Sequence, residues 1–216
     1  MQTKQIIAII GATGNIGSAI SKSLSKGRYR LLLYANEEEK MKLLVDTIKT
    51  NNPSADVECM NCAVNASWEA DIIISAVPGE EEKEVAERIR EVANQKIVIS
   101  VGTVLRQPYD YLDNLTTNSA AEELQQLLPN SKVIKTFSVK FAPGYVTQVK
   151  GVRLEDALIA GNDREALQTV IELVIYAGLN PIMAGELSVS RKLENMQVTG
   201  IQYSYNWQDG WLFSQN

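Results

Sequence analysis

Histidine is missing from this chain of 216 residues. Histidine is the side chain most often used for proton transfer near neutral pH and as a metal ligand. The chain alone therefore builds neither a Ser-His-Asp hydrolase nor a histidine-based zinc or iron site. Basic residues do not outnumber acidic ones, and the formal net charge is -5. Because proteins that bind nucleic acid usually have a basic surplus, no nucleic-acid partner is expected.

Long hydrophobic runs are missing too. No apolar stretch approaches the roughly 20 residues of a membrane-spanning helix. The first residues, MQTKQIIAIIGATG, lack the charged region and the small-residue cleavage motif of a secretory signal peptide. The sequence therefore predicts a cytoplasmic protein that has no membrane partner.

Cysteine is scarce, and the two cysteines, Cys59 and Cys62, form a C-x-x-C motif. Such a motif is found in redox pairs and in halves of zinc sites. The surrounding residues 55–64 resemble a short strand, on which side chains three positions apart point to opposite faces. No other cysteine or histidine exists to complete a zinc site. We interpret the pair as two half-buried thiols and expect no metal.

Short apolar runs alternate with segments of helical periodicity along the whole chain. This alternation predicts an α/β protein of the Rossmann type, a doubly wound and mostly parallel sheet. We expect one dinucleotide-binding domain over residues 1–216, with a C-terminal helix and aromatic tail over 190–216. Strands are expected at 5–10, 29–34, 55–64, 70–79, 96–102, 132–137, 156–161 and 179–185.

The sequence makes specific predictions for two of the segments that connect the expected strands. Asn36 is expected to cap the helix after the second strand, with Glu39 completing a capping box. Residues 103–118 form a long connection, and connections of that length are often functional.

The most informative motif is GATGNIG, which directly follows the apolar run QIIAII and opens a helical segment. In a dinucleotide-binding turn, the glycine at position 11 permits the tight turn. Gly14 lets the backbone approach a pyrophosphate, and Gly17 lets the helix pack closely. The amide groups at the helix start would bind the anion. Pro78, in the motif SAVPG after the fourth strand, is expected to lie against the ribose or nicotinamide.

Taken together, these motifs resemble the NADP oxidoreductases that use the deazaflavin coenzyme F420. The sequence is also similar to the reductase domain of membrane ferric reductases. The matching stretches are GATGNIG, EEEK, DIIISAVP, KIVIS, SKVIKTF, DALIAGNDREA and AGLNPIMAGELSVSRKLENM. The resemblance implies a homodimeric enzyme that moves hydride between NADP(H) and a flavin-like, deazaflavin or small electrophilic acceptor.

The same resemblance implies positions for the cofactor and the acceptor. Besides the three glycines and Pro78, the cofactor would contact Thr13, Asn15, Ile16, Ala35, Asn36, Lys40, Val77, Val101, Gly102 and Ala142. The wall facing the hydride acceptor would include Phe137, Ser138, Lys140 and Phe141.

The loop after the second strand leaves the choice between NADP and NAD open. The family usually has Ser-Arg there to bind the 2′-phosphate of NADP, whereas this chain has Ala35 and Asn36. Lys40 remains as a cation. Glu37 lies at about the spacing of an acid that selects NAD, although acids are also common in a first helical turn. The family favours NADP, and Glu37 favours NAD.

Two alternatives to this hydride enzyme were weighed. A short-chain dehydrogenase needs a tyrosine followed four residues later by a lysine, and no such pair occurs. A non-catalytic redox sensor that binds NAD(P) agrees with the loss of Ser-Arg and with the altered stretch FSVKFAPG. Stacked rings exchange hydride with little acid–base help, so no catalytic residue is assigned.

Overall fold

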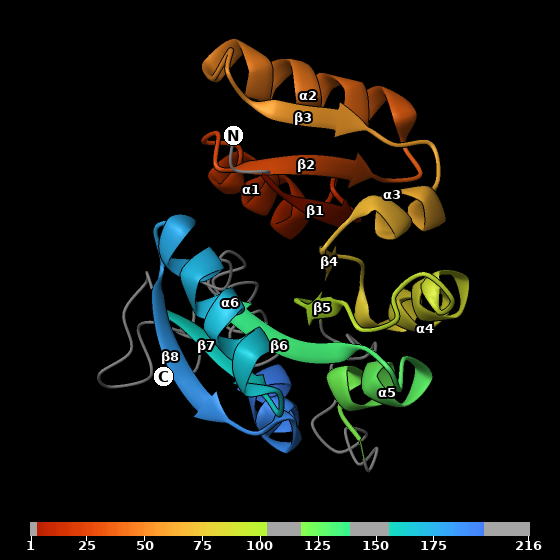
Figure 1. The fold of residues 1–216 in the computed structure, drawn as a ribbon, viewed down its shortest axis with the longest axis vertical. Helices are drawn as coiled ribbons and strands as arrows, with labels where there is room; N and C mark the ends of the chain where they lie inside the picture. Colours follow the sequence, from red (N-terminus) through yellow and green to blue (C-terminus); the bar gives the residue numbers. More distant parts are fainter. Residues whose placement is uncertain (1–3, 103–117, 139–155, 197–216) are drawn as a thin grey trace, which may run out of the picture.

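A computed structural model of the chain describes residues 4–102, 118–138 and 156–196. In these segments the strands form one sheet in the order β3-β2-β1-β4-β5-β6-β7-β8 (Figure 1). The strands are β1 (Gln5–Ile10), β2 (Tyr29–Tyr34), β3 (Asp56–Cys59), β4 (Ile72–Ser75), β5 (Ile97–Ser100), β6 (Lys132–Ser138), β7 (Asp156–Gly161) and β8 (Asn180–Gly185).

Helices cover both faces of this sheet. They are α1 (Asn15–Leu24), α2 (Glu38–Asn51), α3 (Ala63–Glu69), α4 (Gly79–Ile89), α5 (Ala120–Leu127) and α6 (Arg164–Tyr176), followed by the short 3-10 helix η3 (Leu187–Val189) and a helical segment over residues 190–196. Apolar side chains of α1, α2 and α6 pack on one face of the sheet. Those of α3, α4 and α5 pack on the other. The described chain is therefore a doubly wound α/β sandwich, and the predicted fold class is confirmed.

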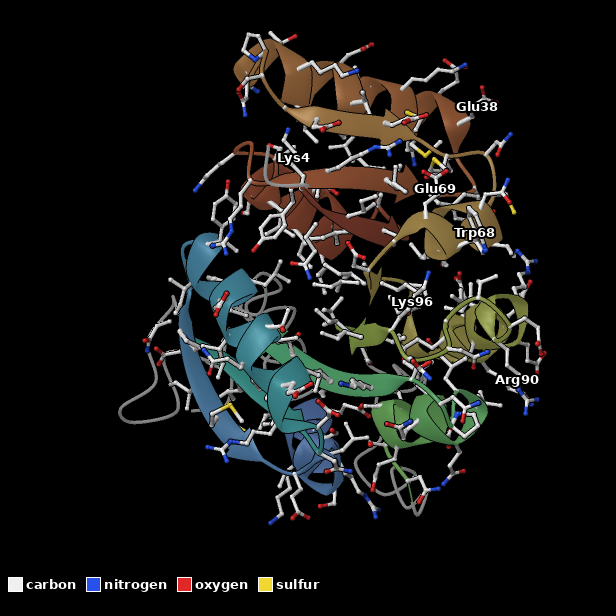
Figure 2. All side chains as sticks on the ribbon, in the orientation of Figure 1. Lys4, Glu38, Trp68, Glu69, Arg90 and Lys96 are labelled. Atoms are coloured by element: carbon white, nitrogen blue, oxygen red, sulfur yellow. The ribbon has the colours of Figure 1, made fainter. Side chains whose placement is uncertain are left out.

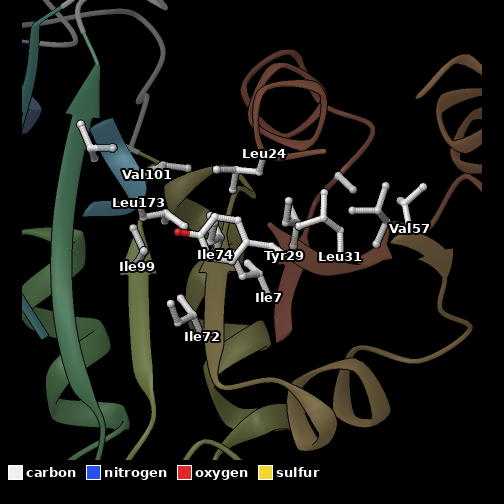
Figure 3. Packing of buried hydrophobic residues seen from close by; sticks show 14 of the residues in the cluster. Ile7, Leu24, Tyr29, Leu31, Val57, Ile72, Ile74, Ile99, Val101 and Leu173 are labelled. Atoms are coloured by element: carbon white, nitrogen blue, oxygen red, sulfur yellow. The ribbon is translucent and has the colours of Figure 1, made fainter. Parts of the chain in front are cut away.

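The strands are apolar along their whole length because both of their faces are covered. In β1, Ile7 and Ile9 join one cluster, whereas Ala8 and Ile10 join the other. Figure 3 shows side chains from neighbouring strands, such as Leu31, packed together on the first face. This burial fixes the register of β1 between β2 and β4.

The strand direction changes in the last part of the sheet. Strands β1 to β6 run parallel to one another, β7 pairs antiparallel with β6, and β8 is parallel to β7. The chain turns in opposite directions from β1 and from β4, which are adjacent. The carboxyl ends of these two strands therefore form the topological switch point of the sheet.

The strand expected over residues 55–64 is wrong in its second half. Strand β3 ends at Cys59, and Cys62 is the extended residue that precedes α3. A helix of seven residues contains too few turns to reveal its period in the sequence. Both thiols are free and half-buried, as expected, and the described residues contain no cluster suited to a metal ion.

The expected cap of α2 is also wrong. The residue that precedes the helix is Glu37, and no side chain caps its first turn. The Asn36 side-chain oxygen instead accepts a hydrogen bond of 3.1 Å from the Tyr34 hydroxyl. That competing contact explains why a capping-type sequence does not form a capping box here.

Several predictions lie outside the described residues. They concern most of the 103–118 connection, Lys140, Phe141 and Ala142, and the aromatic part of the tail. Helix formation near the start of the tail is confirmed over residues 190–196. Within the described chain, no helix combines the length and the apolar character needed to cross a bilayer.

Candidate functional site

A cleft of about 320 Å³ opens at the topological switch point, beside the carboxyl ends of β1, β2 and β4. It is bounded by the β1–α1 turn, the β2–α2 loop, the start of α3 and one face of α4. The lining residues are Ile10, Gly11, Thr13, Gly14, Tyr34, Ala35, Asn36, Glu37, Ala63, Ala76, Val77, Pro78, Glu81, Glu84, Val85 and Arg88. Open α/β sheets bind their ligands at this position.

Two of the three glycines in the β1–α1 turn are required by the protein's own packing. Gly11 has a φ of +84°, and a Cβ there would lie 2.7 Å from the Ala76 carbonyl oxygen. A Cβ on Gly17 would lie 2.2 Å from the Gly11 carbonyl oxygen. These contacts leave no space for a side chain, so both glycines are structural.

Gly14 has a different environment. Its φ is -66°, which any residue can adopt, and the nearest protein atom to a Cβ there would be 3.4 Å away. The fold therefore does not require glycine at this position, which lines the cleft. A glycine that packing does not explain agrees with close approach of a ligand to the backbone.

The start of α1 has the features of an anion site. No side chain caps this helix, and its first turn contains no acidic residue. A helix start carries unpaired amide groups and a partial positive charge, and both favour an anion such as a phosphate. Because Gly14 immediately precedes the helix and lines the cleft, this partial charge is directed at the cleft.

The opposite walls of the cleft are mostly acidic. Glu37 lies on the loop side, where the Lys40 ammonium pairs with it at 2.7 Å. Glu81, Glu84 and Arg88 lie on one face of α4, and Arg88 forms an ion pair with Glu84. Among the described lining residues, Arg88 is the only cation.

The end of β5 packs against the segment after β4 that lines the cleft. Gly102 packs so tightly that a Cβ would lie 2.3 Å from the Val77 carbonyl oxygen. Val77 and Pro78 line the cleft, and Gly102 is directly behind them. Val101 instead lines a separate apolar cavity of about 60 Å³ on the sheet face between α1 and α6.

The structure brings half of the predicted cofactor residues to one cleft, which is lined by Gly11, Thr13, Gly14, Ala35, Asn36, Val77 and Pro78. Asn15, Gly17 and Lys40 lie on its bounding segments without lining it, and Gly102 is at the end of β5. Ile16, like Val101, lines the separate apolar cavity. Phe137 and Ser138 are at the end of β6, and their side chains are outside the described part of the chain.

The family resemblance implied contact between the cofactor and the start of α4, but sequence reasoning named none of the α4 residues that line the cleft. Glu81, Glu84, Val85 and Arg88 are spaced three, four and seven residues apart, so they occupy one face of the helix. This spacing was visible in the sequence. The mostly charged side chains were indistinguishable from an ordinary solvated surface, and only the position of the helix beside the switch point gives them a role.

The sheet order, the glycine turn and the cleft define a dinucleotide-binding protein of the Rossmann class. Residues 6–103 match the family model described as NADP oxidoreductase, coenzyme F420-dependent. The resemblance inferred from the motifs is therefore confirmed: the chain is related to the coenzyme F420-dependent NADP oxidoreductases and is an NAD(P)-dependent oxidoreductase.

Individual relatives agree with this assignment. The chain is 28% identical over 197 residues to an F420-dependent NADP reductase of Methanocaldococcus jannaschii, with 87% of each chain covered. It shares its fold with a candidate F420-dependent NADP reductase from Arthrobacter sp. FB24 (TM-score 0.73, 18% identity, 94% of this chain and 93% of that one). It also shares its fold with the pyrroline carboxylate reductase of Plasmodium falciparum (TM-score 0.61, 14% identity, 97% and 68% covered).

Proposed function

We propose that the chain transfers hydride between NADP(H) bound in the cleft and a deazaflavin coenzyme of the F420 type. The observation that carries the proposal is the start of α1, which no side chain caps and which directly follows Gly14 at the switch point of the sheet. This part of the chain lies within the residues that match the family model. The nicotinamide ring supplies the hydride chemistry when the cofactor is bound. The protein supplies binding, distance and orientation.

The proposed binding mode follows the geometry of the cleft. The amide groups at the start of α1, from Asn15 to Gly17, bind the pyrophosphate, and Gly14 gives it access to the backbone. Ala35, Asn36 and Lys40 surround the adenosine ribose. Val77, Pro78, Val101, Gly102 and Ala142 are proposed for the nicotinamide half, and Phe137, Ser138, Lys140 and Phe141 for the acceptor wall.

Arg88 is the residue that we propose for recognising the 2′-phosphate of NADP. The β2–α2 loop has no arginine, and both Lys40 and Arg88 are ion-paired, with Glu37 and Glu84 respectively, but Lys40 does not line the cleft. Arg88 and Asn36 line the same cleft, Arg88 from α4 and Asn36 from the β2–α2 loop. Of the described residues that line this cleft, Arg88 is the only one with a positive charge. A guanidinium group binds a phosphate through paired, charge-assisted hydrogen bonds.

The Arg88 assignment is tested by comparing the affinities for NADP and NAD. Arg88→Gln should weaken NADP binding roughly tenfold or more, because a charge-assisted hydrogen bond is lost, and should leave NAD binding unchanged. Arg90→Gln is the matched control, because Arg90 is exposed on the outer end of the same helix (Figure 2). Equal losses for both nucleotides in Arg88→Gln would contradict the assignment.

We also propose that the protein acts as a cytoplasmic homodimer and that residues 1–216 form one domain. The family resemblance supports the dimer, since relatives of this kind are expected to pair. Analytical ultracentrifugation tests the dimer, limited proteolysis tests the single domain, and cell fractionation tests the cytoplasmic location.

Turnover separates the enzyme from the alternative of a redox sensor. The absorbance of NADPH should fall when the protein, NADPH and oxidised coenzyme F420 are mixed, and FMN should serve as a comparison acceptor. Saturable NADPH binding without oxidation by either acceptor would favour the sensor and overturn the proposed activity.

A further inference from the structure

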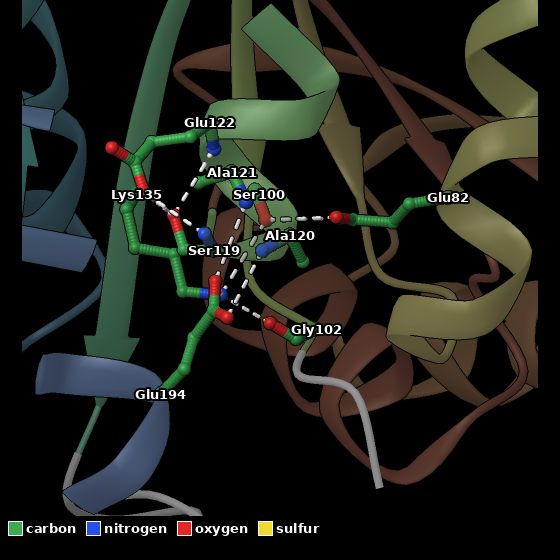
Figure 4. A network of polar contacts seen from close by, with 9 residues as sticks. All are labelled: Glu82, Ser100, Gly102, Ser119, Ala120, Ala121, Glu122, Lys135 and Glu194. Atoms are coloured by element: carbon green, nitrogen blue, oxygen red, sulfur yellow. Dashed lines mark hydrogen bonds and ion pairs between the residues drawn. The ribbon is translucent and has the colours of Figure 1, made fainter. Parts of the chain in front are cut away.

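A buried polar network lies directly behind the nicotinamide end of the proposed cofactor site. Its centre is Lys135 of β6, whose side chain is fully buried within the sheet. The Lys135 ammonium is 3.2 Å from a Glu194 carboxylate oxygen and 3.5 Å from the Ser100 hydroxyl, and it donates a hydrogen bond to the Gly102 carbonyl oxygen (Figure 4). Three segments of the chain therefore meet at one buried cation.

The two carboxylates in the network link it to the starts of two helices. Glu194 accepts hydrogen bonds from the Ala120 amide at 3.0 Å and the Ala121 amide at 3.3 Å, at the start of α5. Glu82, in the first turn of α4, accepts a hydrogen bond of 2.9 Å from the Ser100 hydroxyl. The network thus ties β5 and β6 to α4, to α5 and to the helical segment over residues 190–196.

This arrangement needs an explanation, because burying charge is costly. A buried lysine and a buried carboxylate are tolerated only when their hydrogen bonds are satisfied, and an apolar cluster of similar size is often more stable. Stability alone is therefore a poor reason for Lys135 in a strand whose neighbours Val133 and Ile134 are apolar core residues. A positional role agrees better with the contacts that it makes.

The contact to Gly102 is the one that reaches the cofactor cleft. The Gly102 main chain is clamped, with the Lys135 ammonium on its carbonyl oxygen and the Val77 carbonyl against its α-carbon. Val77 and Pro78 line the cleft. The contact therefore restrains the main chain of Gly102, which packs directly against this lining segment.

We propose that Lys135 is a positioning residue for hydride transfer. It holds the carboxyl end of β5 in one orientation against the Val77–Pro78 segment, and this backbone surface supports the nicotinamide ring. The proposal rests on the proposed function, since it assigns Lys135 to one half of that cofactor site. The network residues are on β5, on β6, at the starts of α4 and α5 and in residues 190–196, whereas the adenosine half would lie at the β2–α2 loop and at Arg88, near the other end of α4.

The test compares NADPH with 2′,5′-ADP, which carries the adenosine half of NADP and no nicotinamide. In Lys135→Met, the dissociation constant of NADPH should rise about tenfold, and that of 2′,5′-ADP should stay within about twofold. The fluorescence enhancement of bound NADPH should also fall, because it reports how firmly the nicotinamide ring is held. Lys132→Met is the matched control, since Lys132 is on the same strand and pairs with Asp163 at the half-exposed edge.

Lys135→Met alone leaves the Glu194 carboxylate buried without its cation, which could unfold the protein. The double variant Lys135→Met/Glu194→Gln removes that charge as well and is therefore measured alongside the single variant. Parallel losses of NADPH and 2′,5′-ADP binding, or unchanged NADPH binding and fluorescence in a folded variant, would overturn the proposal. So would failure of both variants to fold, which would make Lys135 a stability residue. Wild-type protein that binds neither ligand would instead refute the proposed function itself.

Discussion

The protonation of Glu82 is controlled by its buried surroundings. Its side chain is almost completely buried, and burial raises the pKa of Glu82 from 4.5 to about 7. The Lys135 ammonium and the Ser100 hydroxyl oppose this shift without cancelling it. The folded protein therefore retains a proton on Glu82 at pH values where the unfolded chain has lost it.

This difference predicts how stability depends on pH. The folded state binds more protons than the unfolded state between about pH 4.5 and 7, so the contribution of Glu82 is fully present below that window and is lost as pH rises through it. The loss is on the order of 3 kcal/mol. Glu82→Gln, which can still accept from Ser100, should flatten the decline in urea-unfolding free energy between about pH 4.5 and 7. Equal slopes in the wild type and the variant would contradict the assignment, and Glu81→Gln, an exposed neighbour, is the control.

Asn36 gives a second prediction at this scale. Asn36→Arg places a cation where the family resemblance implies one, after the second strand, at a residue that lines the cleft. The variant should bind NADP several-fold more tightly relative to NAD, because a guanidinium group adds charge-assisted hydrogen bonds to the 2′-phosphate. Isothermal titration with both nucleotides measures this ratio. An unchanged ratio would mean that the 2′-phosphate does not approach this loop.

Some functional residues could be predicted from the sequence and others could not. The glycines at 11, 14 and 17 were predicted because their spacing reflects a backbone requirement. Lys135 was not predicted, since a lysine in the strand KVIKTF could equally point to solvent at a sheet edge. Only the neighbouring strands and Glu194, distant in sequence, show that it is buried.

At the scale of elements, the β1–α1 connection separates folding requirements from binding requirements. Gly17→Ala adds a Cβ that would lie 2.2 Å from the Gly11 carbonyl oxygen. Alanine gains about 1 kcal/mol of helix propensity, but overpacking costs about 1–3 kcal/mol or more, and this contact is with backbone that cannot easily move. We expect a net loss of stability, measured by urea denaturation. A stabilised Gly17→Ala protein would show that α1 does not pack this closely.

The elements that the sequence missed are those defined by tertiary contacts. Helix α3 is too short to show a period, and the start of α2 lost its expected cap when Asn36 paired with Tyr34. The long, strongly periodic helices and the apolar strands were predicted correctly. Their signal is repeated over several turns or over a whole buried run, so one competing contact does not erase it.

On the scale of the whole molecule, alternation of strands and helices was enough to predict a doubly wound sheet. It did not predict that β7 runs antiparallel to β6, because a strand's direction is not encoded in its own apolar pattern. The position of the cleft was predictable, since the switch point follows from the order of the first four strands. The acidic wall of α4 and the network behind β5 depend on how distant segments meet.

The central claim is that the start of α1 binds the pyrophosphate of a nicotinamide dinucleotide. The most direct measurement is the thermal shift caused by NADPH in the wild type and in Gly14→Val, whose added side chain blocks the backbone without a clash of its Cβ inside the protein. At a concentration about one hundred times the dissociation constant, NADPH should raise the wild-type melting temperature by roughly 5 to 10 °C. This shift should disappear in Gly14→Val, while the melting temperature of the unliganded variant should change little. An equal NADPH shift in both proteins would contradict the central claim.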